Sequence, residues 1–485
     1  MQQESLKNKT IKGVGWSAAD AFLGQGVTFI VGLVLARLLS PDEYGLIGIC
    51  LIFNTVLNGI VDSGLSNALI RKKNVTDEDY NTMFITNMVI SILLYMLLYF
   101  SSSYISQFFQ RNELTSLIKA TGILLFLNAL SLTHVTILTK RIDFKTKTKA
   151  SILSAIMSGA IGISMAYMGL GVWALVGQML SKQLVYTLTI WALIKWIPSL
   201  KFSLDAFHYM WGFGWKLLVS GLLNSIWNQL YQVVVGKFYS PATLGQYTRA
   251  RQFSSIFSDN LTSIVQRVSY PVLSNIQDEK ERMIEAYRKV IKMTMFVTVL
   301  VLFSLGAVSE PLIHCLIGEK WHQAALFLPL ICISMSLYPL HAINLNMLQV
   351  QGRSDIFLYL EIIKKFISIG PICIGVFVGI YWMLLASILT GVLSFFLNSY
   401  YTGKKLGYSS WAQLRDVAPT YGIAIIIVLS VYFIKFLPLN GLVVLILQIF
   451  VGLIVFFLSC HFLKNEEFKD IRNIISNLIK RKNEK

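Results

Sequence analysis

Long apolar runs separated by short polar connections extend along the chain from Val14 to about Leu463. A hydrocarbon core about 30 Å thick requires about 20 apolar residues for one helical crossing. Runs of this length recur about fourteen times, and Gly, Pro or charged residues mark the connections between them. The pattern predicts an all-α polytopic membrane protein of about fourteen transmembrane helices. The predicted spans lie near residues 13–37, 44–70, 81–105, 114–138, 149–168, 171–195, 208–238, 244–270, 287–309, 323–349, 354–379, 381–402, 416–437 and 440–463.

The composition agrees with a chain that folds in lipid. Hydrophobic residues make up 55% of the 485 residues and charged residues only 14%, which is too little charge to cover a soluble protein of this length. The five cysteines are an odd number and lie mostly in apolar segments, so they predict no disulfide framework. The first apolar run has the length of a span and lacks a small-residue cleavage site, so we expect it to be a helix and not a cleaved signal.

The net charge of +17 is distributed over connections and does not form one patch interleaved with aromatic residues. A nucleic-acid partner is therefore not expected. Alternate connections carry Lys and Arg, whereas the others, such as "SPDEYG" and "LPLNG", hold almost none. This positive-inside pattern predicts a multi-pass protein with both termini in the cytoplasm. The basic connections include Arg71, Lys72, Lys73, Lys140, Arg141, Lys145, Lys147, Lys149, Lys195, Lys201, Arg282, Arg288, Lys289, Arg353, Lys404, Lys405 and Arg415.

One short pattern occurs twice. The stretches "ARLLSPDEYG" and "GKFYSPATLG" place Ser-Pro and a following Gly at residues 200 apart. Upstream, Gly15-Trp16 and Gly214-Trp215 agree in register within one residue. The chain between the two Ser-Pro turns contains an even number of predicted spans, so both turns are expected outside. We interpret this as a parallel repeat of six helices, the arrangement of a transporter with its substrate between two bundles.

The repeat predicts four segments. Residues 1–200 and 201–405 are expected to form the two six-helix lobes, and residues 406–463 two additional spans. Residues 464–485 place Phe468, Ile471 and further apolar residues at helical spacing among Lys and Arg. This spacing predicts a cytoplasmic basic amphipathic tail on the inner membrane surface.

The N-terminal half also resembles a known family. The residues "GWSAADAFLGQGVTFIVGLVLARLLSPDEYGLIGI", then "DSGLSNALIRKK" and "LTKRIDFK", are similar to bacterial polysaccharide flippases of the Wzx type. These belong to the multidrug/oligosaccharidyl-lipid/polysaccharide exporter superfamily, and the resemblance extends over the chain in span number and repeat. The N-terminal motif is specific to the branch associated with exopolysaccharide and teichuronic-type export, and the last two helices are less so.

The resemblance implies a function without covalent chemistry. It implies a flippase of the bacterial inner membrane that translocates an undecaprenyl-diphosphate-linked oligosaccharide for capsule or lipopolysaccharide biosynthesis, through a cationic cavity. Membrane lipids and the lipid-linked oligosaccharide are its expected partners, with a polysaccharide polymerase and glycosyltransferases as further candidates. Two alternatives stay open: an integral-membrane glycosyltransferase or polymerase, which would need catalytic groups on outer loops that are short here, and a multidrug antiporter, which would need an acidic cavity.

Ionisable and polar residues within predicted spans are candidates for the substrate path, because such groups are unfavourable in lipid. In the seventh span, Lys216, Ser220, Asn224, Trp227 and Tyr231 share one stripe. Amides suit sugar hydroxyls and ring faces suit the apolar side of a sugar. The alternative is that the stripe only packs one helix against another.

The eighth span has a basic and polar face along its length. Arg249, Asn260 and Arg267 lie near one line, and Asp259 is expected as a partial counter-ion. We predict that these cations, with Lys216, hold the diphosphate or acidic sugars.

The first lobe places polar residues in similar positions. Asp20 in the first span, Asp62 in the second and Asp259 in the eighth are candidates for coupling to protons or sodium ions, although Asp20 or Asp62 would equally suit a pair with Arg71. Lys182 marks an inward face of the sixth span.

In the eleventh span, Glu361 and Lys365 are expected to pair at i, i+4, leaving Lys364 as a substrate-facing cation. We expect no cofactor and no metal: His314, Cys315 and His322 share an outer loop, but nothing else in the sequence completes a site.

Overall fold

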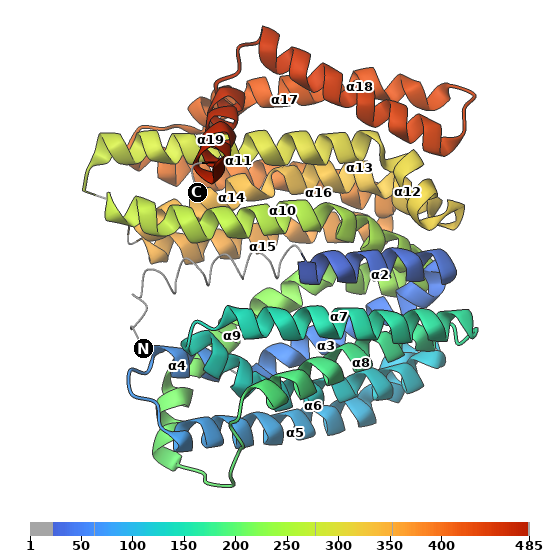
Figure 1. The fold of residues 1–485 in the computed structure, drawn as a ribbon, viewed down its shortest axis with the longest axis vertical. Coiled ribbons are helices and arrows are strands. Elements are labelled where there is room, and N and C mark those ends of the chain that lie inside the picture. The colour runs from blue at the N-terminus through green and yellow to red at the C-terminus, as the bar shows by residue number, and fades with distance from the viewer. Residues whose placement is uncertain (1–22, 63, 277, 352, 484–485) are drawn as a thin grey trace. The chain divides into compact units, whose positions relative to one another are not determined.

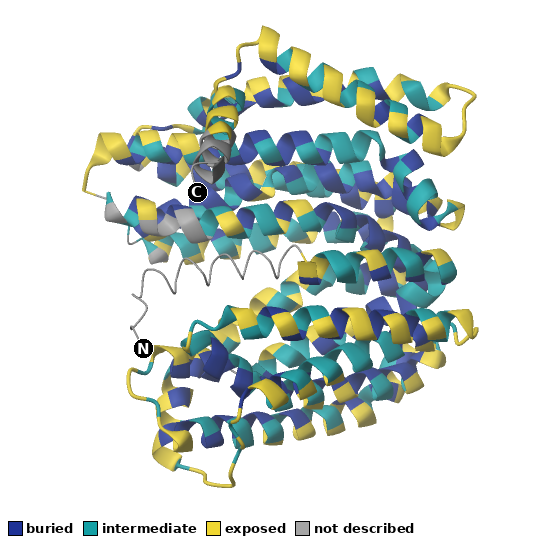
Figure 2. Cartoon of the chain, in the orientation of Figure 1, coloured by how far each residue is buried: buried dark blue, intermediate teal, exposed yellow. Residues whose placement is uncertain are grey.

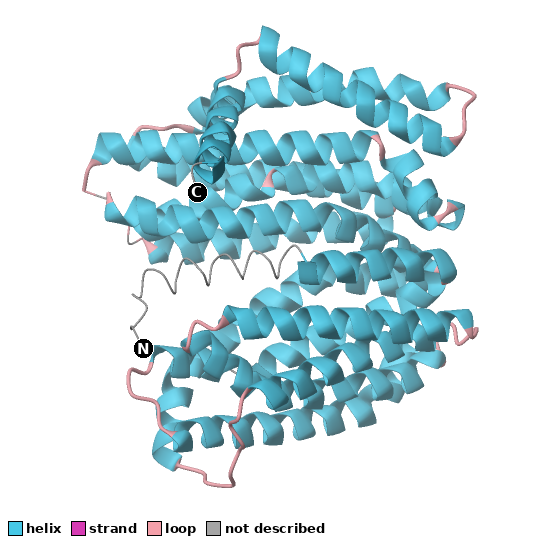
Figure 3. Cartoon of the chain, viewed as in Figure 1, coloured by secondary structure: helices cyan, strands magenta, loops and turns pink. Residues whose placement is uncertain are grey.

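The computed structural model describes residues 23–62, 64–276, 278–351 and 353–483. Side chains are not described at residues 267, 268, 270, 271, 275, 354, 405, 474, 475 and 477–483. Within the described ranges, all regular elements are helices (Figure 3). The chain divides into two compact units, which meet in the sequence at Gly245 and Gln246.

The first unit contains eight described helices and the first turn of a ninth (Figure 1). Helices α5, α6, α7 and α8 pack side by side, and α9 packs on α3, α4 and α5. The helices are α2 (Gln25–Leu38), α3 (Pro41–Asp62), α4 (Leu65–Arg71), α5 (Asp77–Phe109), α6 (Glu113–Lys140), α7 (Phe144–Tyr167), α8 (Val172–Leu193) and α9 (Leu204–Phe238), followed by the start of α10 (Pro241–Asn275).

The second unit contains the rest of α10 and nine further α-helices. Helix α11 packs on α13 and α17, and α17 packs on α18. The helices are α11 (Lys280–Ala307), α12 (Ser309–Ile317), α13 (His322–Ser336), α14 (Tyr338–Val350), α15 (Ser354–Phe377), α16 (Ile380–Leu406), α17 (Ser410–Tyr432), α18 (Gly441–Phe462) and α19 (Glu466–Asn483), with short 3₁₀ turns at Glu319–Trp321 and Phe433–Phe436.

The fold class predicted from hydrophobic patterning is confirmed. Nine segments in the described part of the chain are long and apolar enough to cross a membrane. Helix α18 illustrates their character, because only 11% of its most apolar window is buried in the protein and the rest is exposed or half-buried (Figure 2). The count of fourteen spans and the lobe boundaries at 200 and 405 stay predictions.

Most predicted boundaries lie within a few residues of the observed ones, but two predicted spans are interrupted. The second becomes α3 and α4, with Gly64 between them at a φ of 68°. A Cβ atom at Gly64 would lie 2.7 Å from the carbonyl oxygen of Gly214 in α9, so glycine is required by conformation and by contact. The tenth becomes α13 and α14, separated at Leu337.

The two Ser-Pro turns have equivalent structures. Each serine precedes a helix that begins at the proline. Proline is favoured at the first helical position because the backbone N–H that it lacks has no hydrogen-bond partner within the helix there. The two helix starts contact each other reciprocally: a Cβ on Gly45 would lie 1.7 Å from the carbonyl oxygen of Pro241, and a Cβ on Gly245 would lie 2.0 Å from that of Pro41. The repeated glycine therefore lets two backbones touch, and all four residues belong to the first unit.

A buried polar network fastens α17 to α11 and α14 in the second unit. Tyr287 Oη donates to Asn344 Oδ1 at 2.8 Å, and Asn344 Nδ2 donates to Gln413 Oε1 at 3.0 Å. Nearby, Arg288 and Tyr408 both donate to Asp416, whose side chain is only 8% exposed. Burial raises the pKa of Tyr408, which keeps its hydroxyl protonated as a donor. Such a network holds one arrangement because every broken bond would leave a buried polar group unpaired.

Candidate functional site

Most candidate site residues lie on long helices that carry polar or charged residues within their apolar runs. Helices α8, α9, α10 and α15 each exceed 20 residues, but they are not among the nine segments that combine the hydropathy of a span with few charged residues. Eleven of the twelve candidate positions named in the sequence analysis as substrate-binding or ion-coupling, other than Asp20, lie on these helices or on α3: Lys182, Lys216, Asn224, Trp227, Tyr231, Arg249, Asp259, Asn260, Arg267, Lys364 and Asp62. Polar and charged side chains on these helices are unfavourable in lipid, so they must face water, other parts of the protein or a ligand.

Helix α9 carries an exposed polar stripe. Lys216, Ser220 and Asn224 follow one another at successive turns and are exposed, while Trp227 and Tyr231 continue the stripe and are half-buried. Ser203 begins the helix by accepting a hydrogen bond from the backbone N–H of Ala206 at 3.3 Å. The structure therefore agrees with the predicted spacing of the stripe and adds that its first three members are accessible.

Helix α4 and the start of α9 are held together beside this stripe. Arg71 lies over the ring of Phe213, 4.9 Å from its centroid, and Lys72 lies 5.2 Å from that of Tyr209. These cation–π contacts, with the approach of Gly64 to Gly214, fix the N-terminal half of α9. We did not anticipate the contacts, although the aromatic residues at the start of α9 were a visible signal.

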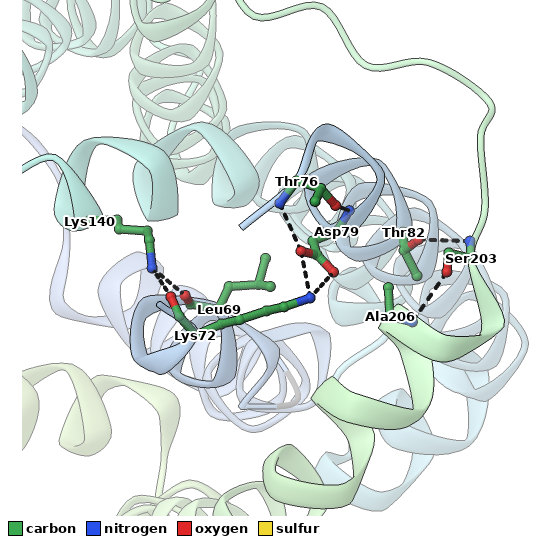
Figure 4. A network of polar contacts seen from close by, with 8 residues as sticks. All are labelled: Leu69, Lys72, Thr76, Asp79, Thr82, Lys140, Ser203 and Ala206. Carbon is green, nitrogen blue, oxygen red and sulfur yellow. Dashed lines mark hydrogen bonds and ion pairs between the residues drawn. The ribbon is translucent and has the colours of Figure 1, made fainter. Parts of the chain in front are cut away.

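Figure 4 shows the polar contacts that hold α4 and the connection before α9. The Lys140 ammonium donates to the carbonyls of Leu69 and Lys72 at the end of α4, and the Lys72 ammonium lies 2.7 Å from Asp79. Asp79 also accepts the backbone N–H of Thr76, which completes a capping box at the start of α5. Ser203 N–H donates to Thr82 Oγ1 at 3.0 Å, and Ser199 N–H donates to Asn81 Oδ1 at 2.7 Å. Lysines at this end of the unit thus serve partly as structural donors.

Lys182 of α8 reaches the polar face of α2. Its Nζ donates to Thr28 Oγ1 at 2.9 Å, and Thr28 in turn donates to the carbonyl of Gly24. Lys182 was predicted on an inward face of the sixth span, and the structure brings it into contact with Thr28 of α2. Asp20, predicted in the first span as a candidate for ion coupling, lies outside the described residues.

Helix α3 presents two polar side chains, Asn58 and the predicted Asp62, to neighbours in the first unit. Asn58 Oδ1 accepts from Asn128 Nδ2 of α6 at 2.8 Å, and Asp62 Oδ1 accepts from Ser66 Oγ of α4 at 2.5 Å. Asn128 was missed by sequence reasoning, although an amide within an apolar run was the available signal. The bond from Ser66 places the Asp62 carboxylate at the break between α3 and α4.

Arg249 in the second unit is buried. Its side chain is 4% exposed; Nη1 donates to Gln252 Oε1 at 2.6 Å, and the guanidinium lies 5.9 Å from the centroid of the buried Trp321 ring. One turn earlier, Gln246 accepts the N–H of Ala324 and donates to the carbonyl of Lys320. These contacts give Arg249 a packing role at this end of α10, and its role toward substrate stays a prediction.

The predicted pairing on α15 is wrong. Lys364 forms the ion pair with Glu361, at i, i+3, so Lys364 is not the free cation that the i, i+4 spacing of Lys365 suggested. The helical geometry permits both spacings, and sequence alone does not choose between them. Elsewhere in this unit, Asp259 is exposed. Asn260 Nδ2 donates to the carbonyl of Ile256, and the Arg267 side chain lies outside the described residues.

Comparison with known proteins agrees with this arrangement. The model of the polysaccharide biosynthesis protein family matches residues 34–326. The succinoglycan biosynthesis transport protein ExoT of Rhizobium meliloti is 24% identical over 376 residues, covering 77% of this chain and 76% of its own. The teichuronic acid biosynthesis protein TuaB of Bacillus subtilis is 26% identical over 361 residues, covering 73% of this chain and 74% of its own.

A solved structure shows the same fold. The lipid II flippase MurJ, in an inward closed conformation, superposes with a TM-score of 0.71 at 17% identity, covering 94% of this chain and 99% of its own. The predicted resemblance to polysaccharide flippases of the Wzx type is confirmed. From the match over more than half of its length, this multi-pass membrane protein belongs to the polysaccharide biosynthesis protein family.

Proposed function

We propose that the protein is a flippase that moves an undecaprenyl-diphosphate-linked oligosaccharide across the cytoplasmic membrane for surface polysaccharide biosynthesis. The names of its relatives support this: one is a succinoglycan transport protein, another a teichuronic acid biosynthesis protein, and the structural neighbour is a lipid II flippase. The reaction involves no covalent step, so the protein needs a polar path and no catalytic groups.

The single observation that carries the proposal is the exposed polar stripe of α9. Lys216, Ser220 and Asn224 are accessible on a helix that packs against α3 and α5, both of which belong to segments apolar enough to cross a membrane. An unsatisfied polar group in hydrocarbon costs several kcal/mol, so this face requires water or a polar ligand. A hydrated sugar headgroup supplies that ligand, while its polyprenyl tail stays in lipid.

The charge of the candidate residues suits an anionic headgroup. Lys216 is exposed and Lys182 is half-buried, and both lie within long helices. An ammonium group compensates the diphosphate that the oligosaccharide carries. An inside-negative membrane potential would also favour the exit of this anion, by about 2.3 kcal/mol per charge per 100 mV. Asp62 or Asp259 would additionally bind a proton or sodium ion if transport is coupled to an ion gradient. The proposed electrostatic step does not require this coupling.

Reconstitution tests the function directly. Purified protein in liposomes is expected to transfer a fluorescent undecaprenyl-diphosphate oligosaccharide between leaflets, measured as the rate at which the fluorophore becomes accessible to an impermeant quencher. Protein-free liposomes provide the baseline. If the protein instead joins sugars to the lipid without changing its leaflet, the membrane glycosyltransferase alternative is correct. Transport of lipophilic cations in place of the oligosaccharide would support the multidrug antiporter.

We further propose a location in the bacterial inner membrane with both termini in the cytoplasm, based on the Lys and Arg asymmetry. Single cysteines at Asp42 or Thr243, near the two Ser-Pro turns, are expected to react with an impermeant thiol reagent added to intact cells. A cysteine at Lys73 or Lys147 is expected to react only after the cells are opened. Labelling of the Lys73 position from outside would reverse the orientation.

A further inference from the structure

Helix α19 is attached to α11 by ion pairs. The Asp470 carboxylate lies 2.7 Å from Lys289 Nζ, and Glu467 lies 2.8 Å from Lys292 Nζ. Glu466 approaches Lys292 at 3.3 Å, although its side chain is 82% exposed. All three acidic residues in the first turns of α19 therefore face lysines of α11.

Apolar contacts reinforce this attachment. The Phe468 ring packs edge-on against Phe456 and Phe457 of α18, with centroids 5.7 and 6.0 Å apart. Ile471 packs against the hydrophobic core that α11 and α17 share. Asn465 accepts the backbone N–H of Phe468 at 2.9 Å and so caps the start of the helix. Together these contacts determine which face of the first turns of α19 is turned inward.

The attachment separates the charges of α19. Its acids are engaged with α11, whereas Lys469 and Arg472 are exposed. After Asp470, the sequence continues with Arg472, Lys480, Arg481 and Lys482, and the next acid is Glu484. The helix start therefore exposes Lys469 and Arg472 beside Glu466, which shares Lys292 with Glu467. The sequence beyond Arg472 adds only positive charge up to residue 483.

The position of α19 places this charge at a membrane surface. The helix begins at Glu466, four residues after the end of α18, which is long and apolar enough to span. Its later apolar residues, Ile474, Ile475 and Leu478, recur at helical spacing in the sequence. A helix of this composition binds in the plane of an interface, and each basic residue there is attracted to anionic lipid.

We propose that α19 is a binding surface for anionic phospholipid headgroups. The pairs of Asp470 with Lys289 and of Glu467 with Lys292 hold these two acids against α11 and thereby orient Lys469 and Arg472 toward the lipid. The surface is independent of the substrate path, because it uses none of the residues assigned to that path. Its ligand is the headgroup of a neighbouring lipid and not the translocated oligosaccharide.

The test measures which lipid surrounds α19. The full-length protein carries a fluorophore on Ser476→Cys, an exposed position, in a background with Cys315 and Cys373 replaced by serine. In nanodiscs that contain equal amounts of phosphatidylglycerol and phosphatidylcholine, only one lipid is brominated at a time. Brominated phosphatidylglycerol is expected to quench about two- to fivefold more strongly than brominated phosphatidylcholine, and the preference should fall at high salt.

Charge variants separate this proposal from a general lipid contact. Lys469→Gln with Arg472→Gln should remove most of the preference, whereas Lys404→Gln, an exposed lysine at the end of α16, should leave it unchanged. Lys289→Gln should reduce the preference by releasing Asp470, and thermal unfolding confirms that each variant is folded. Equal quenching by the two lipids, or an unchanged preference in the Lys469→Gln, Arg472→Gln protein, would overturn the proposal.

Discussion

Gly45→Ala and Gly245→Ala are expected to destabilise the folded protein strongly. A methyl group at either position would lie within 2.0 Å of a backbone carbonyl oxygen, a distance that no side-chain rotation can relieve. The two helix starts would have to separate, and overpacking of this kind costs about 1–3 kcal/mol or more. We expect each variant to lower the midpoint of thermal unfolding and the amount of folded protein in the membrane, measured by size-exclusion chromatography after heating.

Two other glycines provide matched controls. A Cβ at Gly59, in the same helix as Gly45, would meet its first neighbour at an ordinary 3.9 Å, and a Cβ at Gly221 would meet nothing within 4 Å. Alanine is the better helix former by about 1 kcal/mol, so Gly59→Ala and Gly221→Ala should be neutral or stabilising. The opposite signs make the test sharp. A Gly45→Ala protein as stable as Gly59→Ala would show that the two Ser-Pro helix starts do not touch.

Lys216→Gln is expected to abolish most transport while leaving the protein folded. The side chain is exposed, so its removal creates no cavity, and the expected loss is one charge-assisted contact to the anionic headgroup. Such a contact is worth about 1.5–3 kcal/mol, which corresponds to roughly a 10- to 100-fold slower rate. The measurement is the flipping rate in liposomes, together with surface glycan per amount of membrane protein in cells.

Three further variants locate the effect of Lys216. Lys216→Arg should keep part of the activity because the charge is retained, although the geometry of its donors differs. Trp227→Ala should reduce transport less than Lys216→Gln, since it removes a stacking surface and no charge. Lys201→Gln removes an exposed lysine ahead of α9 and should have little effect. Normal flipping by Lys216→Gln would remove the α9 stripe from the substrate path.

Several features could be predicted from local sequence. Apolar run length identifies the helices, because each must satisfy its backbone hydrogen bonds internally within lipid, and so the boundaries of α5, α6 and α18 follow closely from the residues. The spacing of Lys216, Ser220 and Asn224 on one side of α9 follows from helical periodicity alone. Prolines were less informative, since Pro329, Pro371 and Pro419 lie inside helices that continue past them.

Which side chains contact one another could be learned only from the tertiary structure. The sequence by itself determined the helical class, the repeated Ser-Pro turns and the family, because these depend on periodicity and on short motifs. The tertiary structure alone decided that Glu361 pairs with Lys364, that Lys182 meets Thr28, and that Arg249 is buried against Trp321. A side chain on a helix has several neighbours within reach, and the packing of helices distant in sequence selects among them. The same reason applies to the repeated glycine after each Ser-Pro turn. Its spacing can be read from the sequence, but only the tertiary structure shows that Gly45 and Gly245 allow two backbones to come into contact.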